Sequence, residues 1–141
     1  MNQLAKRKCH INTSVTGGNL TIIQTTIGTP WQINTDNKIL LLEDIGERGY
    51  RVDRILEHLR QADIFKNVAA VLLGDFTPGY EPNGMSLIEP VLKRFAEACD
   101  FSVVKINGIG HNYINYPMPL GTISELILGE DPQLICSRGI K

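Results

Sequence analysis

Runs of consecutive apolar residues recur along this chain and predict its strands. Residues 39–42 and 68–73 form two such runs, and their length indicates strands that are buried on both faces of a sheet. Residues 101–106 are a third strand candidate. Near the end of the chain, residues 123–128 and 133–136 flank a turn and predict a β-hairpin.

Between these runs, apolar residues recur at every third or fourth position. Residues 50–62 and 86–96 have this periodicity, which is typical of amphipathic helices. Ser86 and Glu89 also have the spacing of a capping box, so the second helix is expected to begin there. The alternation of strands and helices predicts an α/β fold with the buried strands in one sheet.

The beginning of the chain carries weaker signals. Residues 6–16 contain β-branched residues in partial alternation and predict a short first strand. Residues 17–19, Gly-Gly-Asn, are expected to form a turn. Apolar residues at helical spacing then predict a short helix over residues 20–27.

The composition limits the class of protein. The chain has 141 residues, of which 14 are basic and 15 acidic, and its formal net charge is −1. We therefore expect one domain, with no surface for nucleic acid and no basic face for a membrane. No apolar stretch approaches the roughly 20 residues of a membrane-spanning helix. The three cysteines lie far apart, which argues against a disulfide framework and favours a reducing compartment.

Two residues that follow predicted strands are the candidates for chemistry. Glu43 comes directly after the run at 39–42, and His111 lies in a glycine-rich loop after residues 101–106. If these strands are parallel in one sheet, both side chains emerge at the same edge, within reach of a hydrogen bond. A carboxylate that accepts the Nδ1 proton of an imidazole makes Nε2 a competent general base. Glu43 and His111 would then be two members of a catalytic triad.

The third member, a nucleophile, is not evident in the sequence. No serine lies in a strand–turn–helix elbow. Cys99 falls at a predicted helix end and Cys136 in the hairpin, so neither has an activating context. The other two histidines are interpreted as a strand-face residue, His10, and a helix-surface residue, His58.

A metal site is the alternative interpretation of the acidic residues near the predicted sheet edge. Its candidate ligands are His111, Asp75, Asp44 and Glu43. No paired ligand motif such as His-x-x-x-His supports such a site. We therefore expect neither a metal ion nor another cofactor.

Several motifs, in order along the chain, resemble those of a known family. They are Gly17-Gly18-Asn19-Leu20, Ile27-Gly28-Thr29-Pro30, Leu40-Leu41-Leu42-Glu43-Asp44 with Glu47, Tyr50-Arg51-Val52-Asp53-Arg54, Gly74-Asp75-Phe76, and Gly108-Ile109-Gly110-His111 with Pro119-Leu120-Gly121. From Gly17 onward the sequence resembles the C-terminal half of the LD-carboxypeptidases, a serine-peptidase family that includes the microcin C immunity peptidases. The resemblance implies a swivelling β/β/α domain with a mixed, mainly parallel sheet and flanking helices.

The resemblance also implies an activity and a role for each candidate residue. Family enzymes are described as Ser-Glu-His peptidases that remove the terminal D-alanine from murein tetrapeptides during peptidoglycan recycling in the cytoplasm. By motif, Glu43 corresponds to the triad carboxylate and His111 to the general base. The serine and the oxyanion-hole amides of the family lie in a separate N-terminal domain, and the enzymes are commonly homodimers.

Nothing in this sequence corresponds to the nucleophile domain of the family. We therefore expect residues 1–141 to be the Glu/His-bearing half of such an enzyme, inactive alone and competent with its N-terminal partner. A second hypothesis, from another class, is a non-catalytic module that binds muropeptide or a partner protein.

Overall fold

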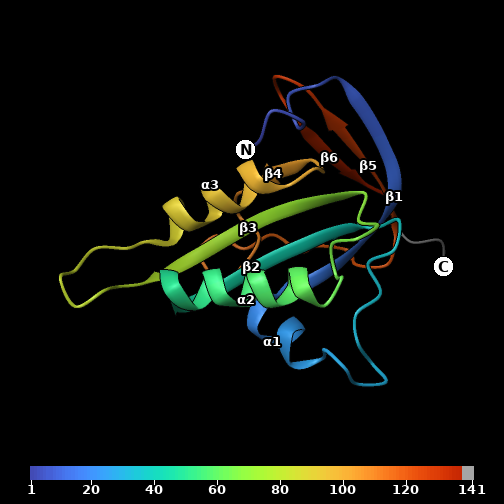
Figure 1. Cartoon of the computed structure of the whole chain (residues 1–141). Coiled ribbons are helices and arrows are strands. Elements are labelled where there is room, and N and C mark those ends of the chain that lie inside the picture. Colours follow the sequence, from blue (N-terminus) through green and yellow to red (C-terminus); the bar gives the residue numbers. More distant parts are fainter. Residues whose placement is uncertain (138–141) are drawn as a thin grey trace.

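A computed structural model describes residues 1–137, which form a curled sheet with helices on one face (Figure 1). The strands of this part of the chain are β1 (Cys9–Asn19), β2 (Ile39–Arg48), β3 (Ala70–Gly79), β4 (Val103–Lys105), β5 (Ile123–Leu128) and β6 (Gln133–Cys136). Its helices are α1 (Leu20–Thr25), α2 (Gly49–Gln61) and α3 (Ile88–Ala98). None of these helices is long and apolar enough to cross a membrane.

The sheet is mixed, with parallel strands on one side of β1 and antiparallel strands on the other. Its order is β4-β3-β2-β1-β5-β6. The four strands β1 to β4 are parallel to one another, whereas β5 is antiparallel to β1 and β6 is antiparallel to β5. The predicted α/β class, the mainly parallel sheet and the closing hairpin are therefore confirmed.

The two faces of β2 contribute to different hydrophobic clusters, because successive side chains of a strand alternate between faces. Leu40 and Leu42 pack against the three helices. Ile39 and Leu41 point to the opposite face, where they belong to a cluster with Leu126 of β5. The curled sheet thus gives three layers: helices, parallel strands and the antiparallel strands beside β1 (Figure 1). This is the β/β/α arrangement that the resemblance implies.

The first strand differs from its prediction, and the turn expected at residues 17–19 is wrong. β1 begins at Cys9 and continues through Asn19, and Gly17 pairs with Leu41 of β2. A Cβ atom at position 17 would lie only 2.0 Å from the carbonyl oxygen of Leu41. The backbone of Gly17 also has a φ of 124°, which residues with side chains rarely adopt. Gly17 therefore allows two strands to approach closely and does not form a turn.

The strands β2 and β3 extend beyond their predicted ends at residues 42 and 73. They continue to Arg48 and Gly79 as a parallel pair. The apolar runs mark only the parts of these strands that are buried on both faces, which is why the pattern missed the rest. The third predicted strand, 101–106, is shorter than expected and forms β4.

The helices differ from the predictions at their ends. α1 stops at Thr25 instead of residue 27, and α3 begins at Ile88 instead of residue 86. The expected capping box is absent, because Leu87 occupies the N-cap position and makes no side-chain cap hydrogen bond. Instead, the Oγ atom of Ser86 accepts a hydrogen bond from the backbone N–H of Ile88 at 3.3 Å.

Candidate functional site

Glu43 and Asp44, adjacent on β2, point to opposite faces of the sheet. Glu43 shares the face of Leu41, away from the helices, and Asp44 shares the helix-covered face of Leu42. Both residues are buried, with whole-residue exposed fractions of 6% and 3%. Glu43 was expected just past the end of its strand, but it lies within β2 and pairs with Asn19 of β1. The two acids therefore belong to different sites.

Asp44 anchors the beginning of α1. Its Oδ2 accepts hydrogen bonds from the backbone N–H and the hydroxyl group of Thr21, at 3.0 and 2.8 Å. Its Oδ1 accepts from the side-chain amide of Asn19 at 3.0 Å and from the backbone N–H of Ile45 at 2.8 Å. A carboxylate at this place satisfies N–H groups that the first turn of a helix leaves unpaired. The role of Asp44 is therefore structural.

A β-bulge in β3 lies opposite Glu43. The pairing of β2 with β3 shifts by one residue here, so that Gly74 and Asp75 together face the single residue Glu43. A Cβ atom at position 74 would lie 2.5 Å from the carbonyl oxygen of Ile109. The absence of a side chain at Gly74 thus allows the loop that follows β4 to pass directly over the strand.

His111 lies on this loop and contacts Glu43. Its Nδ1 atom is 2.6 Å from Oε2 of Glu43. The Glu43 side chain is 8% exposed, and the imidazole is 47% exposed. Because a carboxylate accepts hydrogen bonds, the neutral imidazole carries its proton on Nδ1, and Nε2 keeps a lone pair. Within residues 1–137, no group forms a hydrogen bond with Nε2.

The contact predicted between Glu43 and His111 is therefore present. The imidazole is oriented by a buried carboxylate and can accept a proton at Nε2, which is the arrangement of a general base.

An open hollow of about 680 Å³ adjoins the same loop. Its lining consists of amide, carboxylate and aromatic side chains together with one glycine and one isoleucine. These residues are Asp75, Asn107, Gly108, Asn112, Tyr113, Ile114 and Tyr116. Tyr113 and Tyr116 are exposed. A lining of aromatic surface with a few polar groups is typical of sites that bind small ligands.

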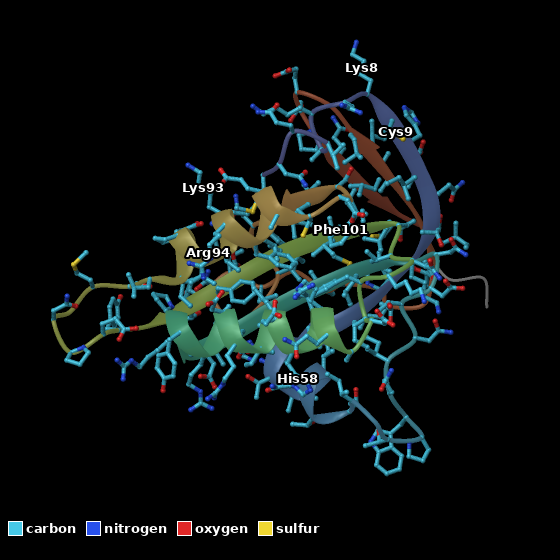
Figure 2. All side chains as sticks on the ribbon, in the orientation of Figure 1. Lys8, Cys9, His58, Lys93, Arg94 and Phe101 are labelled. Atoms are coloured by element: carbon cyan, nitrogen blue, oxygen red, sulfur yellow. The ribbon has the colours of Figure 1, made fainter. Side chains whose placement is uncertain are left out.

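The other sequence candidates are engaged elsewhere. Nδ1 of His10 lies 2.8 Å from Oε1 of Glu125, on the antiparallel strands. His58, on the outer surface of α2 (Figure 2), lies with its Nδ1 2.9 Å from Nε2 of Gln24. At the end of α3, burial raises the pKa of the Cys99 thiol to about 12, so its thiolate is scarce at neutral pH. These contacts confirm the strand-face and helix-surface interpretations, and Cys99 has no activating context.

The residues of the alternative metal site are not arranged as ligands of one ion. Asp44 faces the helices, whereas Glu43 and His111 bond to each other on the opposite face. Asp75 accepts a hydrogen bond from the backbone N–H of Gly108 at 3.0 Å. Across residues 1–137, no group of three or more His, Cys, Asp or Glu side chains is placed to hold a metal ion.

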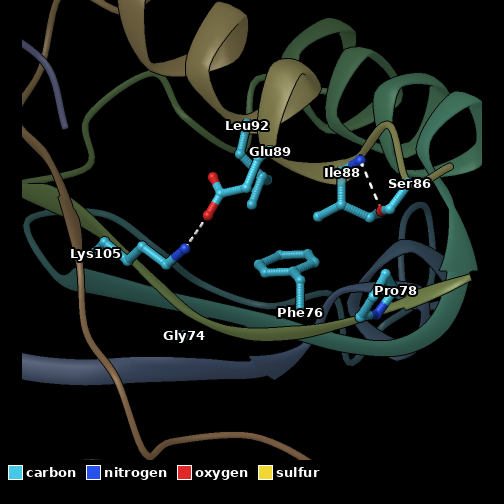
Figure 3. Close-up of a pocket in the computed structure, with 8 residues that line it drawn as sticks. All are labelled: Gly74, Phe76, Pro78, Ser86, Ile88, Glu89, Leu92 and Lys105. Atoms are coloured by element: carbon cyan, nitrogen blue, oxygen red, sulfur yellow. Dashed lines mark hydrogen bonds and ion pairs between the residues drawn. The ribbon is translucent and has the colours of Figure 1, made fainter.

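A separate cavity of about 220 Å³ lies on the helix side of the sheet (Figure 3). It is formed by β3, the end of β4 and the beginning of α3, and it is lined by the ion pair between Lys105 and Glu89. Figure 3 shows the ring of Phe76 between that pair and Pro78. Because Glu43 points to the other face, this cavity is not part of the Glu43–His111 site.

Sequence reasoning missed the residues that hold the loop of His111. Asp75 was considered as a metal ligand and as part of the Gly74-Asp75-Phe76 motif, but not as a partner of this loop, and Asn115 was not considered as a site residue. The Oδ1 atom of Asn115 accepts a hydrogen bond from the backbone N–H of Gly110 at 3.1 Å, beside the bond between Asp75 and Gly108. The Gly74-Asp75-Phe76 motif draws attention to Asp75, but neither this motif nor a polar residue near a glycine identifies the partner of either side chain.

Known proteins resemble the chain over nearly its whole length. Residues 12–126 match the model of the LD-carboxypeptidase C-terminal domain. The chain is 42% identical over 135 residues to a putative carboxypeptidase of Rickettsia conorii, an alignment that covers 96% of this chain and 41% of the relative. It is 28% identical over 124 residues to a murein tetrapeptide carboxypeptidase of Pseudomonas aeruginosa, with 87% and 40% covered. The chain thus spans about two fifths of the length of these relatives.

Solved structures share its fold. The crystal structure of a muramoyltetrapeptide carboxypeptidase from Oxalobacter formigenes matches with a TM-score of 0.82 and 29% identity, over 96% of this chain and 49% of that chain. A microcin self-immunity protein matches with a TM-score of 0.80 over 96% of this chain and 41% of its own, and at 20% identity this likeness shows the fold alone. The chain therefore belongs to the LD-carboxypeptidase family, and its residues 12–126 form the C-terminal domain of that family.

Proposed function

We propose that this chain is the Glu/His-bearing half of a serine-type LD-carboxypeptidase, with Glu43 and His111 as two members of the catalytic triad. The observation that carries the proposal is the 2.6 Å contact between Nδ1 of His111 and the carboxylate of Glu43. This contact lies within the residues that match the LD-carboxypeptidase C-terminal domain.

In the proposed mechanism, Nε2 of His111 removes the proton of a serine hydroxyl as its oxygen attacks the scissile carbonyl. The same nitrogen later donates this proton to the leaving amine. Glu43 holds the Nδ1 proton and stabilises the imidazolium ion that forms in between. The serine and the oxyanion-hole donors come from the N-terminal part of the enzyme. Without that serine, Nε2 has no hydroxyl proton to accept, and the chain alone is inactive.

The substrate in this proposal is a murein tetrapeptide, from which the enzyme releases the terminal D-alanine. The names of several relatives support this substrate class, among them a murein tetrapeptide carboxypeptidase of Pseudomonas aeruginosa and a probable murein peptide carboxypeptidase of Bacillus subtilis that is 31% identical to this chain. The hollow beside the loop of His111 combines aromatic surface with amide and carboxylate groups, which supports a peptide ligand. We place the activity in cytoplasmic peptidoglycan recycling and propose that the complete enzyme is a homodimer.

A chimeric enzyme tests the proposal. The chain would replace the matching C-terminal domain of the Oxalobacter formigenes enzyme, whose structure defines the junction. The chimera is expected to release D-alanine from a murein tetrapeptide. His111→Ala should lower kcat by roughly 10⁴-fold, and Glu43→Gln by somewhat less, because the glutamine removes the charge and can select the wrong tautomer.

His10→Ala is the matched control, since His10 is also bonded to a glutamate but lies on the antiparallel strands. It should leave kcat unchanged. An active His111→Ala or Glu43→Gln chimera would refute the role of that residue. If the unmodified chimera folds and binds tetrapeptide in calorimetry without cleaving it, the binding-module hypothesis takes precedence.

A further inference from the structure

We propose that Asp75 is a positioning residue, which holds the loop of His111 so that the imidazole keeps its Nδ1 proton directed at Glu43. This role rests on the proposed function, in which His111 acts as the general base. Asp75 acts through the backbone of the loop and not on the imidazole itself.

The β-bulge in β3 places Asp75 where it can reach the loop. A regular strand would place one residue opposite Glu43. The bulge adds a second residue, so that both Gly74 and Asp75 lie opposite Glu43. Asp75 as a residue is only 8% exposed, at the base of the open hollow that it helps to line. A buried carboxylate needs hydrogen-bond donors, and the loop supplies one.

Asp75 bonds to the loop through both its side chain and its backbone. Its Oδ2 accepts a hydrogen bond from the N–H of Gly108 at 3.0 Å. Its own backbone N–H donates to the carbonyl oxygen of Ile109 at 2.7 Å. Two consecutive residues of the loop are therefore attached to one residue of β3, immediately before the chain reaches His111.

Gly110, the next residue of the loop, is packed so closely that a side chain would not fit there. A Cβ atom on Gly110 would lie 2.8 Å from the carbonyl oxygen of Asp75 and 3.3 Å from Oε2 of Glu43. Because Gly110 is packed between the bulge and the carboxylate that His111 contacts, a shift of the loop changes the distance between Nδ1 and Oε2. A hydrogen bond weakens steeply when its length or angle departs from the optimum.

The side-chain bond to Gly108 is the part of this anchor that mutation can remove. Asp75→Ala and Asp75→Leu both abolish the acceptor, and leucine fills the volume that alanine leaves empty. Asp75→Asn keeps an oxygen that can accept from Gly108 and is the conservative variant. Asp100→Ala, at an exposed aspartate beyond α3, is the matched control.

The readout is the tautomer of His111 in the isolated chain, measured by ¹⁵N NMR of labelled histidine at a pH about two units above the ordinary histidine pKa. His10→Ala and His58→Ala assign the signals. The unmodified chain and the Asp75→Asn and Asp100→Ala variants should show the Nδ1–H tautomer with a low-field proton. Asp75→Ala and Asp75→Leu should shift the population toward Nε2–H, and the Gly108 amide should exchange its hydrogen at least about tenfold faster.

A loss of stability alone would not change the tautomer of the folded protein, so this measurement separates positioning from a general structural role. The proposal is overturned if folded Asp75→Ala or Asp75→Leu retains the Nδ1–H tautomer, and the proposed function would still stand. It is also overturned if neither variant folds, because Asp75 would then be required for the fold as a whole. If the unmodified chain itself carries the Nε2–H tautomer, the proposed function fails together with this inference.

Discussion

A single buried amide joins the beginning of the chain to the edge of the sheet. The Nδ2 of Asn2 donates hydrogen bonds to the carbonyl oxygens of Ala96 and Phe101, at 3.1 and 2.7 Å. Its Oδ1 accepts from the backbone N–H groups of Ala5 and Val103, at 3.2 and 3.1 Å. Both protons of the amide and both lone pairs of its oxygen are therefore used, in a side chain whose residue is only 6% exposed.

We predict that Asn2→Ala lowers the free energy of unfolding by roughly 2–4 kcal/mol, because it leaves buried backbone donors and acceptors without partners. Urea denaturation followed by circular dichroism measures this change. Gln3→Ala is the matched control: Gln3 is exposed and should change the free energy by less than about 0.5 kcal/mol. Equal effects of the two substitutions would show that the hydrogen bonds of Asn2 contribute nothing.

Among the elements, β1 decides how the sheet is assembled. It pairs in parallel with β2 near its end and antiparallel with β5 near its beginning. Figure 1 shows it as a long bent strand that connects the two parts of the sheet. The pairing with β2 depends on Gly17, whose backbone passes close to the carbonyl group of Leu41.

The neighbouring glycines of β1 provide a matched pair for testing this close approach. Both have positive φ angles, 124° at Gly17 and 138° at Gly18. A Cβ atom on Gly17 would lie 2.0 Å from a backbone oxygen, whereas one on Gly18 would meet nothing within 4 Å. Gly18→Ala should cost roughly 1–3 kcal/mol through backbone strain alone. Gly17→Ala should cost at least about 2 kcal/mol more, because the strand must also move.

Thermal and urea unfolding of both variants measure the difference. If the two substitutions destabilise the chain equally, the clash of a Cβ atom at position 17 with Leu41 adds nothing to the free energy of unfolding. The close approach of β1 and β2 would then not be a requirement of the fold.

For the molecule as a whole, β2 and β3 make the two hydrophobic clusters interdependent, because each strand contributes side chains to both. One cluster lies between the parallel strands and the helices, and the other lies under the curled antiparallel strands. Since β2 and β3 carry one face of each cluster, we expect neither cluster to unfold without exposing the other.

We therefore predict that a cavity in the second cluster destabilises the whole molecule in one transition. Leu126 of β5 is 1% exposed, and Leu126→Ala should lower the free energy of unfolding by about 2–5 kcal/mol with an unchanged dependence on urea. Ile135→Ala on β6, at a residue that is 50% exposed, is the control and should have a small effect. A biphasic unfolding curve for Leu126→Ala would show that the antiparallel strands unfold as an independent unit.

The sequence alone determined the elements, their order and the main candidate residues. Apolar runs located the buried parts of β2 and β3, and helical periodicity located α2 within one residue of its ends. The position of Glu43 after one apolar run and of His111 after another predicted that their side chains meet. These features were predictable because buried strands and helices require apolar residues at regular spacings of a few positions along the sequence.

Only the tertiary structure decided which partners each polar or glycine residue has. It assigned Gly17 to a strand, directed Glu43 and Asp44 to opposite faces, and placed Asp75 in a bulge beside the loop of His111. The residues around each position do not reveal these partners. A close backbone approach or a register shift depends on a second segment that is far away in the chain. The local pattern specifies that a residue is buried or polar, whereas the three-dimensional packing specifies what it touches.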